Sequence, residues 1–444
     1  MENKNALERK SGLTIGPDED ISFGQSIILG LQHVLAMDVY VPPFIIATSL
    51  ALSSSHASGL IQATFLGAGL ATLVQVLLFM KLPVCQGPSF VPIGAVIGIY
   101  VGANGMGSVL GACLVGAIAV TLFGCLGIFQ WIVKTFIPPL VSGTIIMIVG
   151  LTLLPSALNS NIYAVTKGGP SLAQNIILAL ITGAVLIFCS MLGDYLPKYG
   201  RFFRISSVII ALAVGCIVAS FMGVLSLDQV AKAPIFSLPY ISFIHYHLTF
   251  SWSAIFTMLI IYIVLLAETT GTWFAVSSVI EEPLSDKQIN RGVIGEGVGC
   301  LLAALVGTTP VTGYSTNAGV ISITGVASRK VFVFAGFWFI ALSFIGKLSA
   351  LINAVPAAVI GGVFAVVCII IMLSGFRVIK DHQFSEREMY VVGVPLIFAM
   401  ALLFIPAKAT AQLPQFLKFL FDSPISVGAL VAILMNKVIP AKNN

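Results

Sequence analysis

The chain has 444 residues, of which 58% are hydrophobic and only 9% are charged. A soluble domain carries about 25% charged residues, so a soluble fold of this size is excluded because its surface would be mostly apolar. The net charge of +5 could indicate an acidic partner such as nucleic acid. The positions of the basic residues explain that charge better, as membrane topology, and no nucleic-acid partner is expected.

Apolar runs of about 20 residues, long enough to cross a hydrocarbon core of about 30 Å, recur from Phe23 to Val438. The first is too long for a signal-peptide core, and no suitable cleavage site follows it. The third and tenth runs are too short to cross alone, so we expect each to join an extended strand to a half-helix. We predict an all-α polytopic membrane protein with fourteen elements, at residues 23–49, 57–79, 90–102, 107–128, 138–154, 174–195, 205–222, 252–279, 293–307, 316–324, 330–352, 357–373, 389–405 and 425–439.

The basic residues support an even number of crossings, which places both termini on the same side. On this topology 17 of the 22 Lys and Arg residues share the side of the termini. The positive-inside rule then makes that side cytoplasmic and residues 1–22 a cytoplasmic tail. The five basic residues left outside are Lys167, Lys232, Lys347, Lys408 and Lys418.

The two halves of the chain resemble each other in spacing. Gly87, which interrupts the third element, lies 64 residues after Phe23, and Asn317 lies 65 residues after Trp252. With seven elements per half, the second half inserts upside down, which predicts a 7+7 inverted repeat. Short interrupted segments at matching places in such halves indicate a transporter's midplane site.

Three acidic residues fall within the predicted spans: Asp38, Glu268 and Glu296. A charged side chain at a helix centre costs about 2.5–3.5 kcal/mol or more, so each is a functional candidate. Glu268 lies in the middle of the eighth element with no basic residue near it in sequence. The alternative is a structural carboxyl hydrogen-bonded by neighbouring hydroxyls.

Two interpretations remain open for each of three residues: Glu296, Asp38 and His33. Glu296, near the start of the ninth element, either acts functionally or accepts hydrogen bonds across helices. Asp38, just before Pro42-Pro43, is either a coupling group or the cap of a helix broken by the prolines. His33 either links helices or contacts the ligand.

The segment Gly307–Gly319 is rich in hydroxyl groups and runs into the apolar stretch Val320–Ile323. This pattern suits an extended stretch that feeds a half-helix, whose first N–H groups would meet carbonyl oxygens or a delocalised anion. We expect the matching half-helix to begin near Ser89-Phe90, with the Phe90 ring free to stack on a flat ligand. The alternative is a packed polar turn.

No pattern supports an enzyme. The sequence has no Walker motif, no zinc-ligand spacing and no strand-turn-helix context for a nucleophilic serine. Its seven cysteines lie singly in apolar stretches, as buried small side chains rather than disulfides or a metal site. The glycines between Gly292 and Gly299 indicate close helix packing.

Residues 316–325 read Thr-Asn-Ala-Gly-Val-Ile-Ser-Ile-Thr-Gly. They resemble the signature of the nucleobase–ascorbate transporter family, also called nucleobase:cation symporter-2, which is Gln, Glu or Pro, then Asn-x-Gly, four residues, Thr, and Arg, Lys or Gly. The segment fits everywhere except at its first position. The resemblance covers Phe23 to Val438 and includes Gln32-His33, Ser89-Phe90, Glu268, Glu296 and the purine-like run Val326–Arg329.

This resemblance implies a fourteen-helix homodimer in the bacterial inner membrane. It implies a core domain, residues 23–128 and 252–352, that moves against a gate domain, residues 129–222 and 353–439. In such proteins the base lies between the positions of Phe90 and Thr316, and the Glu268 carboxylate accepts its ring N–H groups. The predicted substrate-binding set is Glu268, Phe90, Thr316, Ser315, Asn317, Ser89 and Thr272.

Two departures from the family pattern matter. Thr316 replaces the Gln or Glu that normally holds the base, which leaves space or a water there. Thr272 stands where relatives often have Asp or His, so Asp38 could supply a titratable group that Thr272 does not.

The expected function is proton-coupled import of nucleobases by alternating access, with purines (xanthine, urate, hypoxanthine or guanine) ranked above uracil. Glu268, His33, Asp38 and Glu296 are the candidates for proton coupling or its structural support. No metal and no cofactor besides the coupling proton are expected. The alternatives are a uracil permease, an uncoupled facilitator, or an anion transporter of the same fold, although Glu268 would repel small anions.

Overall fold

The computed structural model describes residues 13–439 except 104, 128–134, 137, 166–168, 197–199, 240, 381–383, 407–408, 410–412, 415–416, 418–419 and 422. Within this part, six helices are long and apolar enough to cross a membrane. Four shorter helices are also apolar. The chain is therefore a mostly helical, multi-pass membrane protein, as predicted, whereas fourteen crossings and an inverted repeat remain predictions.

The first half of the chain follows the predicted elements with one correction. The first element is not one helix, because residues 36–40 interrupt it and leave Asp38 in the connection. In order, the elements are α1 (Phe23–Leu35), α2 (Val41–Ser49), α3 (Ser54–Leu73) with the π-helical turn η2 (Val74–Leu78), β1 (Gln86–Pro88), α4 (Ile93–Gly102), α5 (Met106–Cys125), α7 (Pro139–Pro155) with the π-helical η3 (Ser156–Ile162), α8 (Leu172–Tyr195) and α9 (Gly200–Phe221).

A crossover with the short helices α10 (Asp228–Lys232) and α11 (Ser242–His245) leads to the second half. There the eleventh predicted element is also split, between α15 and α16, where Gly346 N–H bonds the Ile235 carbonyl of the crossover (3.0 Å). The elements are α12 (Trp252–Ile280), α13 (Asp286–Leu305), β2 (Val311–Gly313), α14 (Thr316–Thr324), α15 (Arg329–Ser343), α16 (Gly346–Ala354), α17 (Ala357–Ile379), α18 (Glu386–Leu403) and α21 (Pro424–Val438).

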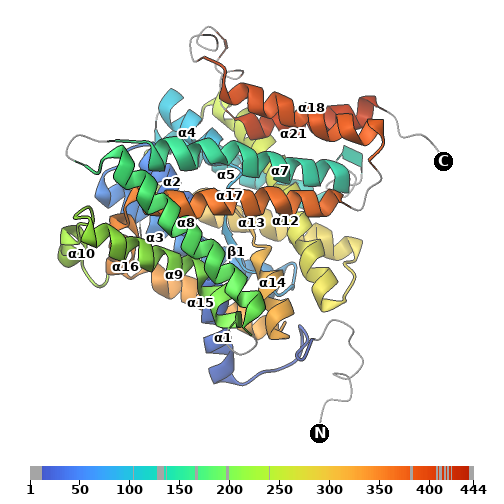
Figure 1. The fold of residues 1–444 in the computed structure, drawn as a ribbon. Coiled ribbons are helices and arrows are strands. Elements are labelled where there is room, and N and C mark those ends of the chain that lie inside the picture. The colour runs from blue at the N-terminus through green and yellow to red at the C-terminus, as the bar shows by residue number, and fades with distance from the viewer. Residues whose placement is uncertain are drawn as a thin grey trace.

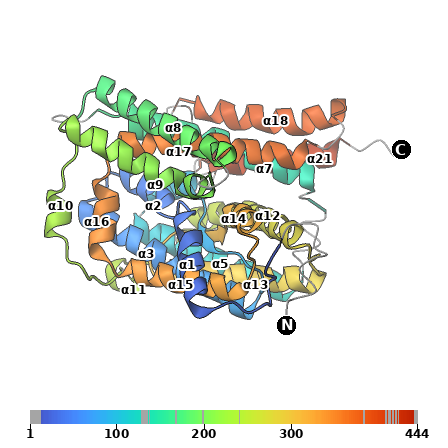
Figure 2. The ribbon, with the colours of Figure 1, turned by 60° about the horizontal axis from the view of Figure 1, so that its bottom comes forward.

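The helices form two packed groups (Figures 1 and 2). Helices α7, α8, α9, α17, α18 and α21 pack against one another, and α1, α3, α5, α12, α13 and α15 form the second group. Contacts between the groups include α12 against α7 and α21, and α2 against α17 and η3. The two groups draw on both halves of the sequence.

Glycines let α13 approach its neighbours closely, as the Gly292–Gly299 pattern predicted. A Cβ on Gly297 would lie 2.5 Å from the Thr121 backbone nitrogen of α5, and one on Gly299 would lie 2.9 Å from the Ala71 Cβ of α3. Helix α13 therefore packs tightly between α3 and α5, which fixes the helix that carries Glu296.

The third and tenth elements each join a strand to a half-helix, which confirms that prediction. Strands β1 and β2 pair antiparallel, with Gln86 opposite Gly313 and Pro88 opposite Val311. The half-helix α4 starts at Ile93, with Pro92 as its N-terminal cap, rather than near Ser89-Phe90. Strand β1 ends at Pro88, and the antiparallel pair of β1 and β2 is called the strand crossing below. The other half-helix, α14, starts at Thr316 as predicted.

Candidate functional site

Glu268 is half-buried in the middle of α12. The Ser89 hydroxyl donates to its Oε2 atom at 2.7 Å. Ser89 is itself fixed: its N–H binds the Pro310 carbonyl (3.0 Å), and its Oγ accepts from Val91 N–H (3.1 Å). The strand crossing thus holds one oxygen of the carboxyl in place.

The start of α14 presents free hydrogen-bond donors. Its cap residue Ser315 makes no side-chain cap bond, and both Ser315 and Thr316 are exposed. Their backbone N–H groups have no partner in the part of the chain that the structure describes. A Cβ on Gly319 would meet open space. Helix α14 packs against α12, so these donors and the positive end of the helix dipole lie on the helix next to that of Glu268.

Tyr314 fixes the register of the two strands. Its hydroxyl donates to the Pro88 carbonyl at 2.9 Å, and its N–H donates to the Cys85 carbonyl at 3.1 Å. Gly87 must lack a side chain, since a Cβ there would lie 2.6 Å from the Tyr314 ring. Tyr314 thereby anchors the residues just before Ser315 and Thr316.

Asn317 is buried, and its amide is committed within the protein. Its Oδ1 accepts from Cys85 N–H at 2.8 Å, and its Nδ2 lies 3.2 Å from Nδ1 of His33. These two bonds give Asn317 a structural role in this conformation, and its direct contact with substrate stays a prediction. Through these bonds Asn317 connects α14 to Cys85, just before β1, and to His33 of α1.

The position of His33 agrees with the interpretation that it links helices. It is buried, meets Asn317 through Nδ1, and its ring lies 4.3 Å from the Phe332 ring on α15. The imidazole connects α1 with α14 and α15 instead of facing an open surface.

Thr272, predicted to bind substrate, is also buried and donates its hydroxyl to the Gly313 carbonyl at 3.0 Å. One turn earlier, Thr269 accepts from Gly313 N–H at 3.1 Å. The pair anchors β2 to α12, and the predicted Thr272–substrate contact stays a prediction.

Phe90 is buried, and its ring stacks on Phe364 of α17, with centroids 5.9 Å apart and an angle of 15°. In this conformation Phe364 covers the Phe90 ring, and stacking of that ring on a flat ligand stays a prediction. The contact joins the connection between β1 and α4 to α17, so a ligand that stacks on Phe90 must displace or adjoin Phe364.

Glu296 lies in the middle of α13 rather than near its start, because α13 begins at Asp286. Its carboxyl is buried, accepts from Gln75 Nε2 at 3.0 Å, and lies beside Thr269 and Gln86. This geometry agrees with the interpretation of hydrogen bonding across helices.

Asp38 is half-buried in the connection between α1 and α2. The cap of α2 is Tyr40, without a side-chain cap bond, so the helix-cap interpretation of Asp38 is wrong.

Sequence reasoning missed three residues of this site: Gln75, Gln86 and Tyr314. The two glutamines lie in or beside apolar runs, and a polar side chain within a membrane segment is a signal that could have identified them. The tyrosine gave no such signal, because its role depends on strand pairing between distant segments.

The arrangement offers one carboxylate acceptor on α12 and backbone donors on α14. Among the described residues, no three His, Cys, Asp or Glu side chains gather as a metal site. The site therefore offers an acceptor and donors to a molecule that carries both N–H and carbonyl groups.

The chain matches the Permease family (Xan_ur_permease) over residues 24–408. The chain belongs to this family, the nucleobase:cation symporter-2 family. Uric acid permease PucJ of Bacillus subtilis is 30% identical over 92% of this chain and 91% of its own length. Xanthine permease of the same organism is 28% identical over 94% of each chain. Uracil permease of Bacillus caldolyticus is 28% identical over 94% of this chain and 93% of its own length.

Among solved structures, the transmembrane domain of the cyanobacterial bicarbonate transporter BicA superposes on this permease with a TM-score of 0.61. That likeness covers 94% of this chain and 100% of BicA's domain at 15% identity, which shows a shared fold alone. Membership of the permease family also confirms that the protein is a transporter and not an enzyme.

Proposed function

We propose that this permease imports nucleobases together with protons, by alternating access. The observation that carries the proposal is the half-buried Glu268 carboxyl, held by Ser89, on the helix that packs against the open start of α14. A nucleobase carries ring N–H groups and carbonyls on one planar edge. Glu268 would accept from the N–H groups, and the free N–H groups of Ser315 and Thr316 would donate to the carbonyls.

Purines are the preferred substrates in this proposal. The relatives named for uric acid and xanthine support a purine, and the run Val326–Arg329 resembles purine members. Thr316 is shorter than the Gln or Glu of the family signature, which leaves room for the larger purine ring or for a water. Uracil is the alternative, supported by the uracil permease relative.

Coupling to protons follows from the surroundings of Glu268. Its hydrogen-bond partner in the described structure is the neutral Ser89 hydroxyl, with no Lys or Arg at the carboxyl. A lone carboxylate is costly at membrane depth, and a proton that neutralises it on one face and leaves on the other would couple to the base. Asp38 is the second candidate for a titrating group, with His33 and Glu296 as structural support.

The moving parts in this proposal are the two helix groups. The group with α1, α3, α5, α12, α13 and α15 would be the core domain, and the group with α7, α8, α9, α17, α18 and α21 the gate domain. We further propose fourteen crossings in a 7+7 inverted repeat, both termini in the cytoplasm of a bacterial cell, and a homodimer. The positive-inside distribution supports the orientation.

The test is uptake of radiolabelled xanthine, urate, hypoxanthine, guanine and uracil by bacterial cells that lack their own nucleobase permeases, with and without an uncoupler. The proposal expects saturable purine uptake that the uncoupler abolishes. Uptake that only equilibrates would make the protein a facilitator. Absence of uptake for every base would overturn the proposal and favour another small planar ligand.

A further inference from the structure

Residues Leu13–Ile21, here called the N-terminal strap, are docked onto the far end of α14 rather than forming a free tail. The Gly325 carbonyl, just beyond α14, accepts from Thr14 N–H (2.7 Å) and Ile15 N–H (3.0 Å) and from the Thr14 hydroxyl (2.8 Å). Ala327 N–H returns a bond to the Ile15 carbonyl (2.8 Å). The strap thus adds a strand-like pairing to the chain that leaves α14.

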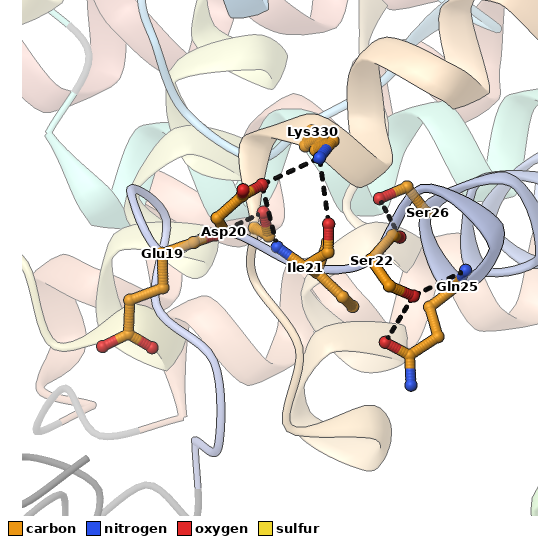
Figure 3. Close-up of polar contacts among 8 residues, drawn as sticks. Glu19, Asp20, Ile21, Ser22, Gln25, Ser26 and Lys330 are labelled. Atoms are coloured by element: carbon orange, nitrogen blue, oxygen red, sulfur yellow. Dashed lines mark hydrogen bonds and ion pairs between the residues drawn. The ribbon is translucent and has the colours of Figure 1, made fainter. Parts of the chain in front are cut away.

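Side chains reinforce this docking at the start of α15 (Figure 3). Lys330 Nζ binds Asp20 Oδ1 at 2.8 Å and the Ile21 carbonyl at 3.0 Å. Arg329 pairs with Asp18, and the Ser328 hydroxyl donates to the Glu19 carbonyl at 2.8 Å. The strap is therefore bound to the α14–α15 connection by backbone hydrogen bonds and by ion pairs.

The half-helix α14 needs such support. It has nine residues, and helices shorter than about 12–15 residues are marginal without tertiary contacts. Its first turn is held by Asn317, through Cys85 and His33. Its last residue is followed by Gly325 in the left-handed conformation (φ 68°), whose carbonyl the strap binds.

The strap and α1 form one continuous segment that contacts both ends of α14. Helix α1 begins at Phe23, one residue after the strap, and its His33 meets Asn317 at the first turn of α14. One stretch of chain, residues 13–35, therefore holds both ends of the half-helix whose start carries the free donors of the site.

We propose that the N-terminal strap is a positioning element for substrate binding, which keeps α14 at the correct distance from Glu268. The inference rests on the proposed function, since the strap acts on the base through α14. Loosening the strap removes no group of the site but lets the donors of Ser315 and Thr316 move away from the carboxyl. The strap thus affects the KM for the base more than the maximal rate.

The first experiment compares Thr14→Pro, Thr14→Val and the wild type by initial-rate uptake, with rates divided by the amount of protein in the membrane. Proline removes both Thr14 donors to Gly325, and valine removes only the hydroxyl. We expect Thr14→Pro to raise the KM about three- to tenfold, from the usual worth of such hydrogen bonds, and Thr14→Val to raise it less. An unchanged KM in Thr14→Pro would overturn the proposal.

A charge exchange tests the ion pair. Asp20→Lys and Lys330→Asp should each raise the KM, and the double variant should return it toward the wild-type value. Glu282→Lys, an exposed acid in the α12–α13 loop, is the matched control and should have no effect. Single variants that match this control, or a double variant no better than either single one, would contradict the role of the pair.

Hydrogen–deuterium exchange of the purified protein separates this inference from the proposed function, because it needs no substrate. Thr14→Pro should speed exchange of the α14 amides and leave those of α8 unchanged. If α14 exchange stays the same, the strap does not position α14, whatever the protein transports. If the wild type takes up no base while α14 exchange rises, the proposed function fails and the strap's hold on α14 stands.

Discussion

The units β1–α4 and β2–α14 share a topology, yet they present different groups at the point where the strands cross. Before α4, the Ser89 N–H is bound by Pro310, and Phe90 is covered by Phe364. At the start of α14, Ser315 and Thr316 are exposed, and their N–H groups have no partner among the described residues. The first unit, here called the closed unit, has its Ser89 N–H and Phe90 ring engaged within the protein. The second, here called the open unit, leaves its donors exposed.

This difference assigns separate tasks to the two units. The closed unit supplies the Ser89 hydroxyl that orients Glu268, together with the Cys85 N–H that holds Asn317. The open unit keeps its donors available to a ligand. Two similar elements can therefore act as the support and the contact surface of the same site, and variants in each should fail in different ways.

The largest effect is expected for Glu268→Gln. The variant should reach the membrane in normal amounts but show base accumulation no higher than that of cells without the protein, because its amide neither takes up nor releases a proton and replaces one acceptor oxygen with an NH2 donor. Uptake with and without an uncoupler measures this, with Glu282→Gln as control. Accumulation against a gradient by Glu268→Gln would show that another residue couples transport.

Asn317→Leu should destabilise the protein rather than alter the contact surface. It leaves the buried Cys85 N–H without its acceptor, and an unsatisfied buried group costs about 1–3 kcal/mol. We expect a lower melting temperature of the purified protein in detergent. An unchanged melting temperature combined with loss of base binding would instead make Asn317 a ligand contact.

Thr272→Val should have a smaller effect of the same kind. The variant loses one buried bond to Gly313, worth about 0.5–1.5 kcal/mol, so thermal stability falls modestly. Thr272→Ser keeps the hydroxyl and should behave as the wild type. If Thr272→Val loses uptake while its stability is unchanged, and Thr272→Ser keeps uptake, the hydroxyl acts on the substrate and not on β2.

Thr316→Gln changes the open unit alone. It restores the first residue of the family signature at an exposed position. It should alter the preference among bases, with a shift in relative KM of up to about tenfold for one added hydrogen bond. Competition of unlabelled bases against labelled xanthine measures this shift, and an unchanged ranking would place the base away from the start of α14.

The smallest effect concerns pH at the strap. The hydrogen bond and charge of Lys330 hold the pKa of Asp20 below its usual value of 3.8. A lowered carboxyl pKa contributes stability that is present above the unfolded value and is lost only as the pH falls through the folded value. Asp20→Asn should therefore leave the shape of the uptake profile unchanged between about pH 5.5 and pH 8. A flattened profile would show that the strap titrates in that range.

Hydropathy predicted where the helices lie, since each apolar run has a helical counterpart in the structure. The break before α2 was also within reach, because Pro42-Pro43 occupy the first turn of that helix, where proline is favoured. The break before α16 was not, because it depends on pairing between Phe236 and Ile345, which lie far apart in sequence.

The sequence indicated which residues are candidates for the site but not which groups they bond. Membrane carboxylates and hydroxyl-rich interruptions are costly in lipid, so Glu268 and the start of α14 were visible in sequence. The sequence could not show that Asn317 and Thr272 bind backbone groups of the strand crossing. Those partners exist only after β1 and β2 pair, which no local pattern reveals.

The most direct test of the account is whether a base covers the start of α14. In purified Thr316→Cys, mass spectrometry would quantify modification of residue 316 by a small thiol reagent, with and without saturating xanthine or urate. The exposed native Cys125 in the same sample is the internal control. The account predicts that the base slows modification at residue 316 and leaves Cys125 unaffected; equal modification at residue 316 with bound base would contradict it.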